Sequence, residues 1–175
     1  MDEDGLLKSY RRKPLARPEN MPVQLDFSRA DIKKIVPHRD PFLLIDRIIA
    51  LNPEEGILAG TRSLSPDIPL FTGHFPGYPV YPGTLQIETI GQLGLCLHHF
   101  IGRNTETIDS DVQPPDVRAT RVCGAYFRAE VRPGDELTIL AKLVEFDAYF
   151  GKVLGQVVVR DTVATVALLE VAFPD

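Results

Sequence analysis

The chain has 175 residues, of which 44% are hydrophobic and 25% charged, and its formal net charge is −5. This length suits one domain with its own core, and the acidic balance argues against a general nucleic-acid binder. Cys96 and Cys123 are far apart and form no CxxC pair, and no uncharged apolar run is long enough to span a membrane. The acidic N-terminus lacks the apolar stretch of a secretory signal, so we expect a soluble cytoplasmic domain without a membrane span.

Residues 1–24 are expected to form a flexible basic N-terminal extension. Three prolines discourage regular structure there, and five basic residues cluster without an acid among them: Lys8, Arg11, Arg12, Lys13 and Arg17. Two interpretations remain open. The segment is either a solvated or loosely docked extension, or a contact for an acidic partner.

Ordered structure is expected from about residue 25. Ser28 is a candidate N-cap of a short helix, with Asp31 in the first turn and Ile32 and Ile35 on one face. Residues 41–51 then favour a strand, and residues 55–64 favour its hairpin partner. The stretch 71–83 contains too much proline and glycine for a helix or a central strand.

Residues 83–101 predict one long helix that is apolar nearly all round and therefore buried. Residues 103–120 are polar and predict a loop. The remaining strands are expected at 122–131, 136–146, 152–160 and 162–173, as an antiparallel meander. The simplest architecture is α+β, with an antiparallel sheet curled around one buried helix.

Two side chains in GHFPGYPVYPGTLQIETIGQ, residues 73–92, predict acid–base chemistry. Burial of Glu88 in the apolar helix would raise its pKa, so that the acid keeps a proton to donate. Gln92 lies four residues later, where its amide can orient the carboxyl group. A neutral imidazole at His74 could act as a base, and N–H groups near Gly83 could polarise a carbonyl. This combination suits 1,2-elimination of water.

Each of these residues also has a purely structural interpretation. A lone loop histidine is more often structural than catalytic, and a glutamate in an apolar helix often reaches the rim with its side chain. His38, next to Arg39 and Asp40, is expected in a turn whose charges pair locally. His98 and His99 lie near the helix end, where cations suit the helix dipole. A metal site built from these histidines is not favoured.

The stretch 73–92 closely resembles the active-site signature of the 3-hydroxyacyl-acyl-carrier-protein dehydratases, the FabZ/FabA group of hot-dog proteins. IVPHRDPFLLIDRI resembles the N-terminal motif of that group, and AYFRAEVRPGDELTI resembles its later strand–turn–strand motif. The three motifs occur in family order and cover roughly residues 25–172. The resemblance implies a single hot-dog domain over residues 25–175, with a curved antiparallel sheet wrapped around a long helix.

The resemblance also implies roles for individual residues. His74 and Glu88 would be catalytic, and the substrate-binding residues would be Gly83, Gln92, Phe75, Val80 and Tyr81. The reaction would be dehydration of (3R)-3-hydroxyacyl to trans-2-enoyl thioesters, without a metal or organic cofactor. The phosphopantetheine arm of an acyl carrier protein would deliver the substrate. Family members pair so that the histidine of one subunit faces the acid of the other, which implies a homodimer and leaves open a trimer of dimers.

The sequence departs from the family pattern at Tyr78, Tyr81 and Asp40, and in the length of the 102–120 loop. These departures bear on pocket shape and leave the acyl-chain length open. Two alternatives also stay open. One is a hot-dog thioesterase, since the fold hosts several acyl-thioester activities. The other is a non-catalytic homologue that binds acyl carrier protein.

Overall fold

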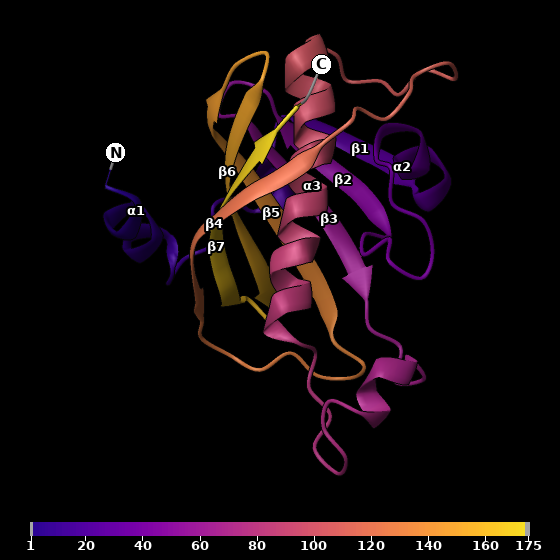
Figure 1. The fold of residues 1–175 in the computed structure, drawn as a ribbon, viewed down its shortest axis with the longest axis vertical. Coiled ribbons are helices and arrows are strands. Elements are labelled where there is room, and N and C mark those ends of the chain that lie inside the picture. The colour runs from indigo at the N-terminus through magenta and orange to yellow at the C-terminus, as the bar shows by residue number, and fades with distance from the viewer. Residues whose placement is uncertain (1, 174–175) are drawn as a thin grey trace.

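The structure is a computed structural model that describes residues 2–173; Met1, Pro174 and Asp175, which belong to the ranges predicted above, lie outside the described residues. Helices and strands alternate early in the chain, and strands alone follow the long helix (Figure 1). The α-helices are α1 (Glu3–Tyr10), α2 (Arg29–Ile35) and α3 (Gly83–Arg103). The strands are β1 (Val23–Ser28), β2 (Arg47–Asn52), β3 (Ile57–Ser63), β4 (Arg118–Phe127), β5 (Glu136–Phe146), β6 (Phe150–Val159) and β7 (Thr162–Ala172). Short 3-10 turns span Pro18–Asn20 and Pro69–Thr72.

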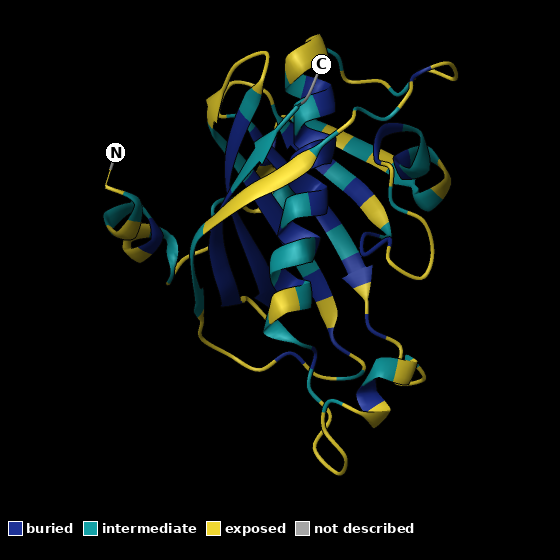
Figure 2. Cartoon of the chain, in the orientation of Figure 1, coloured by how far each residue is buried: buried dark blue, intermediate teal, exposed yellow. Residues whose placement is uncertain are grey.

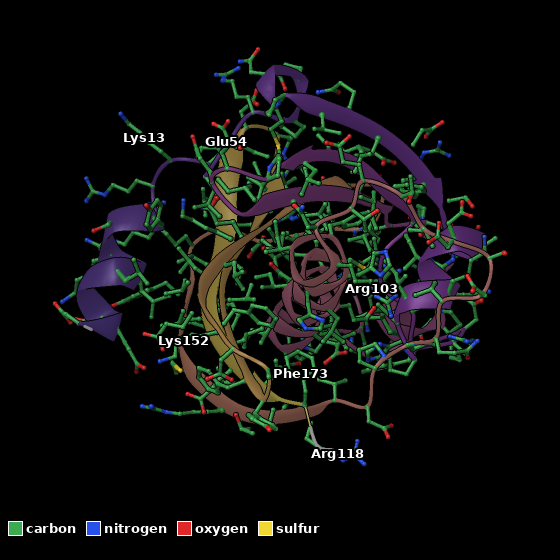
Figure 3. The ribbon with its side chains drawn as sticks, turned by 90° about the horizontal axis from the view of Figure 1, so that it is seen from above. Lys13, Glu54, Arg103, Arg118, Lys152 and Phe173 are labelled. Atoms are coloured by element: carbon green, nitrogen blue, oxygen red, sulfur yellow. The ribbon has the colours of Figure 1, made fainter. Side chains whose placement is uncertain are left out.

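The predicted central helix is confirmed as α3, which has 21 residues and is surrounded by the sheet (Figures 1 and 3). Its apolar residues pack on β3, β5, β6 and β7, and Ile90, Leu93 and Phe100 are fully buried. The helix ends at Arg103, and Asn104 follows in a left-handed backbone conformation that stops the helical pattern. Among residues 2–173, we find no helix with the length and apolar character needed to cross a membrane. The predicted α+β architecture, with an antiparallel sheet curled around one buried helix, is therefore confirmed.

The seven strands form one antiparallel sheet in the order β1-β2-β3-β5-β6-β7-β4. Strands β5, β6 and β7 form the predicted meander, but β4 does not pair with β5. It pairs with β7 instead and lies at the sheet edge, so the prediction of one continuous meander from residue 122 onwards was wrong. The connection from β4 to β5 crosses below the sheet (Figure 1), a long-range arrangement that short turn signals cannot indicate.

The segment before β2 differs from the predicted strand over residues 41–51. Strand β2 begins only at Arg47, and residues 37–46 form a loop. Side chains from elsewhere bind the backbone of this loop: Arg62 and Arg29 donate to the Leu43 carbonyl at 3.2 and 3.0 Å. The predicted N-cap at Ser28 is confirmed, with a capping box formed by Asp31.

The N-terminal segment packs on the outer face of the sheet instead of extending as a structureless tail (Figure 3). Helix α1 ends at Tyr10, before the first proline of the segment, and its Leu7 is buried against β4 at Gly124. The fully buried Gln156 accepts a hydrogen bond from the Leu15 N–H at 2.7 Å, and its amide group donates to two further carbonyls of this segment. The prolines therefore shape a docked connection and do not prevent the helix.

Candidate active site

His74 lies in the Pro/Gly-rich loop that precedes α3, and its ring is fixed by that loop. Nδ1 is 2.8 Å from the Val80 carbonyl oxygen, and the Val80 N–H donates back to the His74 carbonyl at 2.9 Å. A bond to a carbonyl requires a proton on Nδ1, so Nε2 holds the free lone pair. The exposed Phe75 ring stacks on the imidazole at 4.0 Å between centroids. The ring is thus oriented with a basic nitrogen available.

The first residues of α3 line the same cavity as His74. Gly83 is the first residue of the helix, where a backbone N–H has no intrahelical acceptor. A Cβ atom on Gly83 would lie 2.6 Å from the Phe127 ring, so only glycine fits without movement. Val80 and Tyr81 also line this cavity; Tyr81 is buried, and its hydroxyl has no hydrogen-bond partner among the described residues.

Glu88 lies one turn further along α3 and faces a different cavity. Its Oε1 accepts a hydrogen bond from Gln92 Nε2 at 2.9 Å, as the spacing predicted. His38 Nε2 is 3.3 Å from the same oxygen. His38 is the main cause of a lowered pKa of Glu88; burial opposes this effect and Gln92 adds to it. The prediction of a raised pKa was therefore wrong for the single chain, because His38 and Gln92 lower the pKa of Glu88 by more than burial raises it.

His74 and Glu88 do not share a cavity within one chain. The cavity of Glu88 has a volume of about 220 Å³ and is bounded by Ala119, Arg121 and Val122 of β4. The cavity of His74 is bounded by Phe127 at the other end of β4. No residue lines both cavities. A single chain thus holds the two proposed catalytic groups in separate cavities.

The other histidines differ from their predicted settings. His38 contacts Glu88, while Asp40 pairs with Lys33 and Arg29, so the predicted local charge pairing in this turn was wrong. Burial lowers the pKa of both His98 and His99, which disfavours the cationic form expected from the helix dipole. Sequence reasoning missed His38 as a site residue because no local signal links residues 38 and 88.

Within residues 2–173, no group of three or more histidine, cysteine, aspartate or glutamate side chains is arranged to hold a metal ion.

The fold defines the class of protein. A solved structure described as the dehydratase heterocomplex ApeI:P from Xenorhabdus doucetiae aligns with a TM-score of 0.64 and 18% identity, over 82% of this chain and 91% of that chain. The PaaI protein of the E. coli phenylacetic acid degradation operon aligns with a TM-score of 0.51 and 14% identity, over 73% and 78% of the two chains. At these identities the likeness establishes the fold alone, which is that of the hot-dog proteins.

Similarity in sequence identifies the family to which the chain belongs. The FabA-like domain family matches residues 36–167, and the chain belongs to this family. A relative from Campylobacter concisus named 3-hydroxyacyl-[acyl-carrier-protein] dehydratase FabZ is 35% identical over 83% of this chain and 96% of its own length. A relative of the same name from Pelotomaculum thermopropionicum is 40% identical over 79% of this chain and 92% of its own length.

Proposed function

We propose that this chain is a 3-hydroxyacyl-[acyl-carrier-protein] dehydratase, which converts (3R)-3-hydroxyacyl thioesters to trans-2-enoyl thioesters in fatty acid or related acyl-chain biosynthesis. One observation carries the proposal. The FabA-like match runs through residues 36–167 and includes an oriented histidine and a hydrogen-bonded glutamate, His74 and Glu88. Relatives that share this length of sequence bear the dehydratase name.

In the proposed reaction, His74 Nε2 removes a proton from C2 of the substrate. The C2=C3 double bond forms as the C3–O bond breaks, and Glu88 gives a proton to the departing hydroxyl, which leaves as water. The imidazolium then returns its proton to the carboxylate, which restores both groups. The Gly83 N–H at the start of α3 would hold the thioester oxygen and stabilise its enolate character. The two side chains exchange only protons with the substrate and the elimination involves no net oxidation or reduction, so the proposal requires no metal or organic cofactor.

A second copy of the chain would complete the site. Strand β4 is an edge strand of ten residues that is exposed at residues 118–122 and at Phe127 (Figure 2), and Val122 and Phe127 are 56% and 55% exposed. An unpaired edge strand of this length can pair with a strand of another chain through its free backbone N–H and C=O groups. If the β4 strands of two copies paired in antiparallel fashion, the start of each strand would lie beside the end of the other. The cavity of His74 would then adjoin the partner's cavity of Glu88.

Pairing would also change the protonation of Glu88. In the single chain the cavity of Glu88 is open to water, and its side chain is 33% exposed. Cover by a second subunit and by substrate would remove water and favour the neutral acid. We therefore place the proton-donating form of Glu88 in the assembled site. A homodimer is the smallest unit that the proposal requires, and a trimer of dimers would preserve the same site.

The proposed substrate carrier is an acidic acyl carrier protein in the cytoplasm. Arg12, Lys13 and Arg17 are exposed, and Lys13 points away from the body of the molecule (Figure 3). The neighbouring Arg11 carbonyl accepts a hydrogen bond from Arg128 of the β4–β5 connection at 2.6 Å. The connection also supplies Ala129, Glu130 and Val131 to the cavity of His74. The basic segment would therefore steer an acidic carrier towards this entrance.

Purified protein tests the proposal directly. We expect formation of enoyl thioester from a 3-hydroxyacyl thioester, and a fall in kcat of about 100- to 10,000-fold in His74→Ala and in Glu88→Gln. Release of free thiol without enoyl product would identify a thioesterase instead. Full turnover by either variant would contradict the assigned roles, and binding of acylated carrier protein without any turnover would identify a non-catalytic homologue.

A further inference from the structure

His38 is placed directly beside Glu88 by the loop of residues 37–46. Its Nε2 lies 3.3 Å from Glu88 Oε1, slightly longer than a typical N–H···O hydrogen bond. The imidazole packs against the Phe42 ring with 6.3 Å between centroids and an interplanar angle of 29°. Both His38 and Glu88 line the same cavity. The contact is therefore part of the cavity wall.

Gln92 joins the loop and the acid through one side chain. Its Oε1 accepts a hydrogen bond from the Leu44 N–H at 2.7 Å. Its two amide hydrogens go to the Phe42 carbonyl and to Glu88 Oε1, each at 2.9 Å. The amide oxygen and both amide hydrogens therefore have partners. These bonds fix the loop that carries His38 relative to the carboxyl group of Glu88.

The surroundings of His38 decide which nitrogen carries its proton in the neutral form. Nδ1 is buried and has no hydrogen-bond partner among the described residues. A buried N–H group without an acceptor is rarer and more costly than a buried lone pair without a donor. The proton therefore resides on Nε2, the nitrogen that faces Glu88.

We infer that His38 is a positioning residue that, together with Gln92, anchors Oε1 of Glu88 and leaves Oε2 as the oxygen that delivers the proton to the substrate. This inference rests on the proposed role of Glu88 as the acid. The arrangement fits both protonation states of Glu88. In the neutral acid, Oε1 is the carbonyl oxygen that accepts from His38 and Gln92, and the hydroxyl on Oε2 donates. A fixed donor oxygen reduces the rotational freedom that must be lost before proton transfer.

Two charged groups from other elements face the same cavity. Arg121 comes from β4 and Glu170 from β7, and both line the cavity with Glu88. Arg121 is paired with Glu3 of α1 at 3.3 Å, and Glu170 accepts a hydrogen bond from Thr120 at 3.0 Å. Both therefore have partners of their own. Neither supplies a contact to Oε1, which leaves that oxygen to His38 and Gln92.

The experiment compares His38→Ala, His38→Gln and the control Arg39→Ala. Arg39 is exposed and donates to the His38 and Val36 carbonyls, so the control perturbs the same loop without touching Glu88. Glutamine at position 38 keeps an N–H donor. For each variant we would measure kcat and KM with a small 3-hydroxyacyl thioester across pH, and titrate the Glu88 carboxyl carbon by NMR, using Glu88→Gln to assign its signal.

We expect His38→Ala to lower kcat by about tenfold with KM nearly unchanged, and to shift the carboxyl titration and the corresponding limb of the pH profile to higher pH. His38→Gln should recover part of both effects, and Arg39→Ala should show neither. An unchanged titration and pH profile in His38→Ala would overturn the inference, even where activity falls. Loss of activity in Glu88→Gln together with that result would leave the proposed function standing, whereas an active Glu88→Gln would contradict the proposed function itself.

Discussion

His74 and Glu88 line different cavities of the same chain, one at each end of the edge strand β4. His74 is fixed by the Val80 carbonyl, and Glu88 by Gln92. Each group is therefore oriented by contacts within its own chain. In the proposed dimer, a second copy would bring the two cavities together across β4.

The first prediction concerns the close contact between Gly83 and Phe127. In Gly83→Ala the new Cβ would lie 2.6 Å from the Phe127 ring, so the ring or the helix start must move. We expect kcat/KM to fall and the free energy of unfolding to drop by about 1–3 kcal/mol. Gly102→Ala is the control, because its Cβ would meet only ordinary contacts at 3.5 Å or more. Unchanged kinetics in Gly83→Ala would argue against a role for the helix start.

The second prediction concerns the exposed basic residues of the N-terminal segment. Because this segment is docked through Leu7 and Gln156, neutralisation is a cleaner test than deletion. The triple variant Arg12→Gln, Lys13→Gln, Arg17→Gln should raise KM for a carrier-bound substrate severalfold at low salt, and high salt should remove the difference. KM for a small thioester should stay unchanged. Equal KM values for the carrier-bound substrate would show that these charges are merely solvated.

The third prediction concerns how α1 is attached. Leu7 is 3% exposed and packs on β4 at Gly124, so Leu7→Ala should lower the free energy of unfolding by about 2–3 kcal/mol in urea titrations. Ser9→Ala on the exposed side of α1 should change it by less than about 0.5 kcal/mol. If the two variants were equally stable, α1 would not be docked in solution as it is in the structure.

The fourth prediction concerns pH. Hydrogen bonds from Lys33 and Arg29 lower the pKa of Asp40 from 3.8 to about 2. Since the folded pKa is depressed, ionised Asp40 favours folding above pH 3.8, and this contribution is lost as the pH falls towards 2. Asp40→Asn should therefore flatten the dependence of unfolding free energy on pH in this window. Asp67→Asn, a change at an exposed aspartate elsewhere, should leave the dependence in place.

Some of this arrangement could be predicted from sequence because its signals are local. The apolar pattern of residues 83–101 defined α3 to within two residues, and Ser28 with Asp31 defined the start of α2. Gln92 was found beside Glu88 because four residues correspond to one helical turn. The assignment of His74 needed the resemblance to a known signature, since a single loop histidine carries little information.

The rest depends on contacts between distant segments. The edge position of β4 follows from its pairing with β7, which no turn signal between β4 and β5 indicates. The contact of His38 with Glu88 depends on a loop that Gln92 holds from 48 residues away. The docking of α1 depends on the buried Gln156, whose partners lie more than 140 residues earlier in the chain. The lowered pKa of Glu88 follows from the same long-range contacts.

The most direct test of the shared site mixes two inactive variants, His74→Ala and Glu88→Ala, after unfolding and refolding them together. A mixed dimer would contain one site with both intact groups and one site with neither. Random pairing should therefore restore about a quarter of the wild-type dehydratase activity, while each variant refolded alone stays inactive. The absence of any recovery, with mixed dimers demonstrated by mass spectrometry, would contradict a site built from His74 of one subunit and Glu88 of the other.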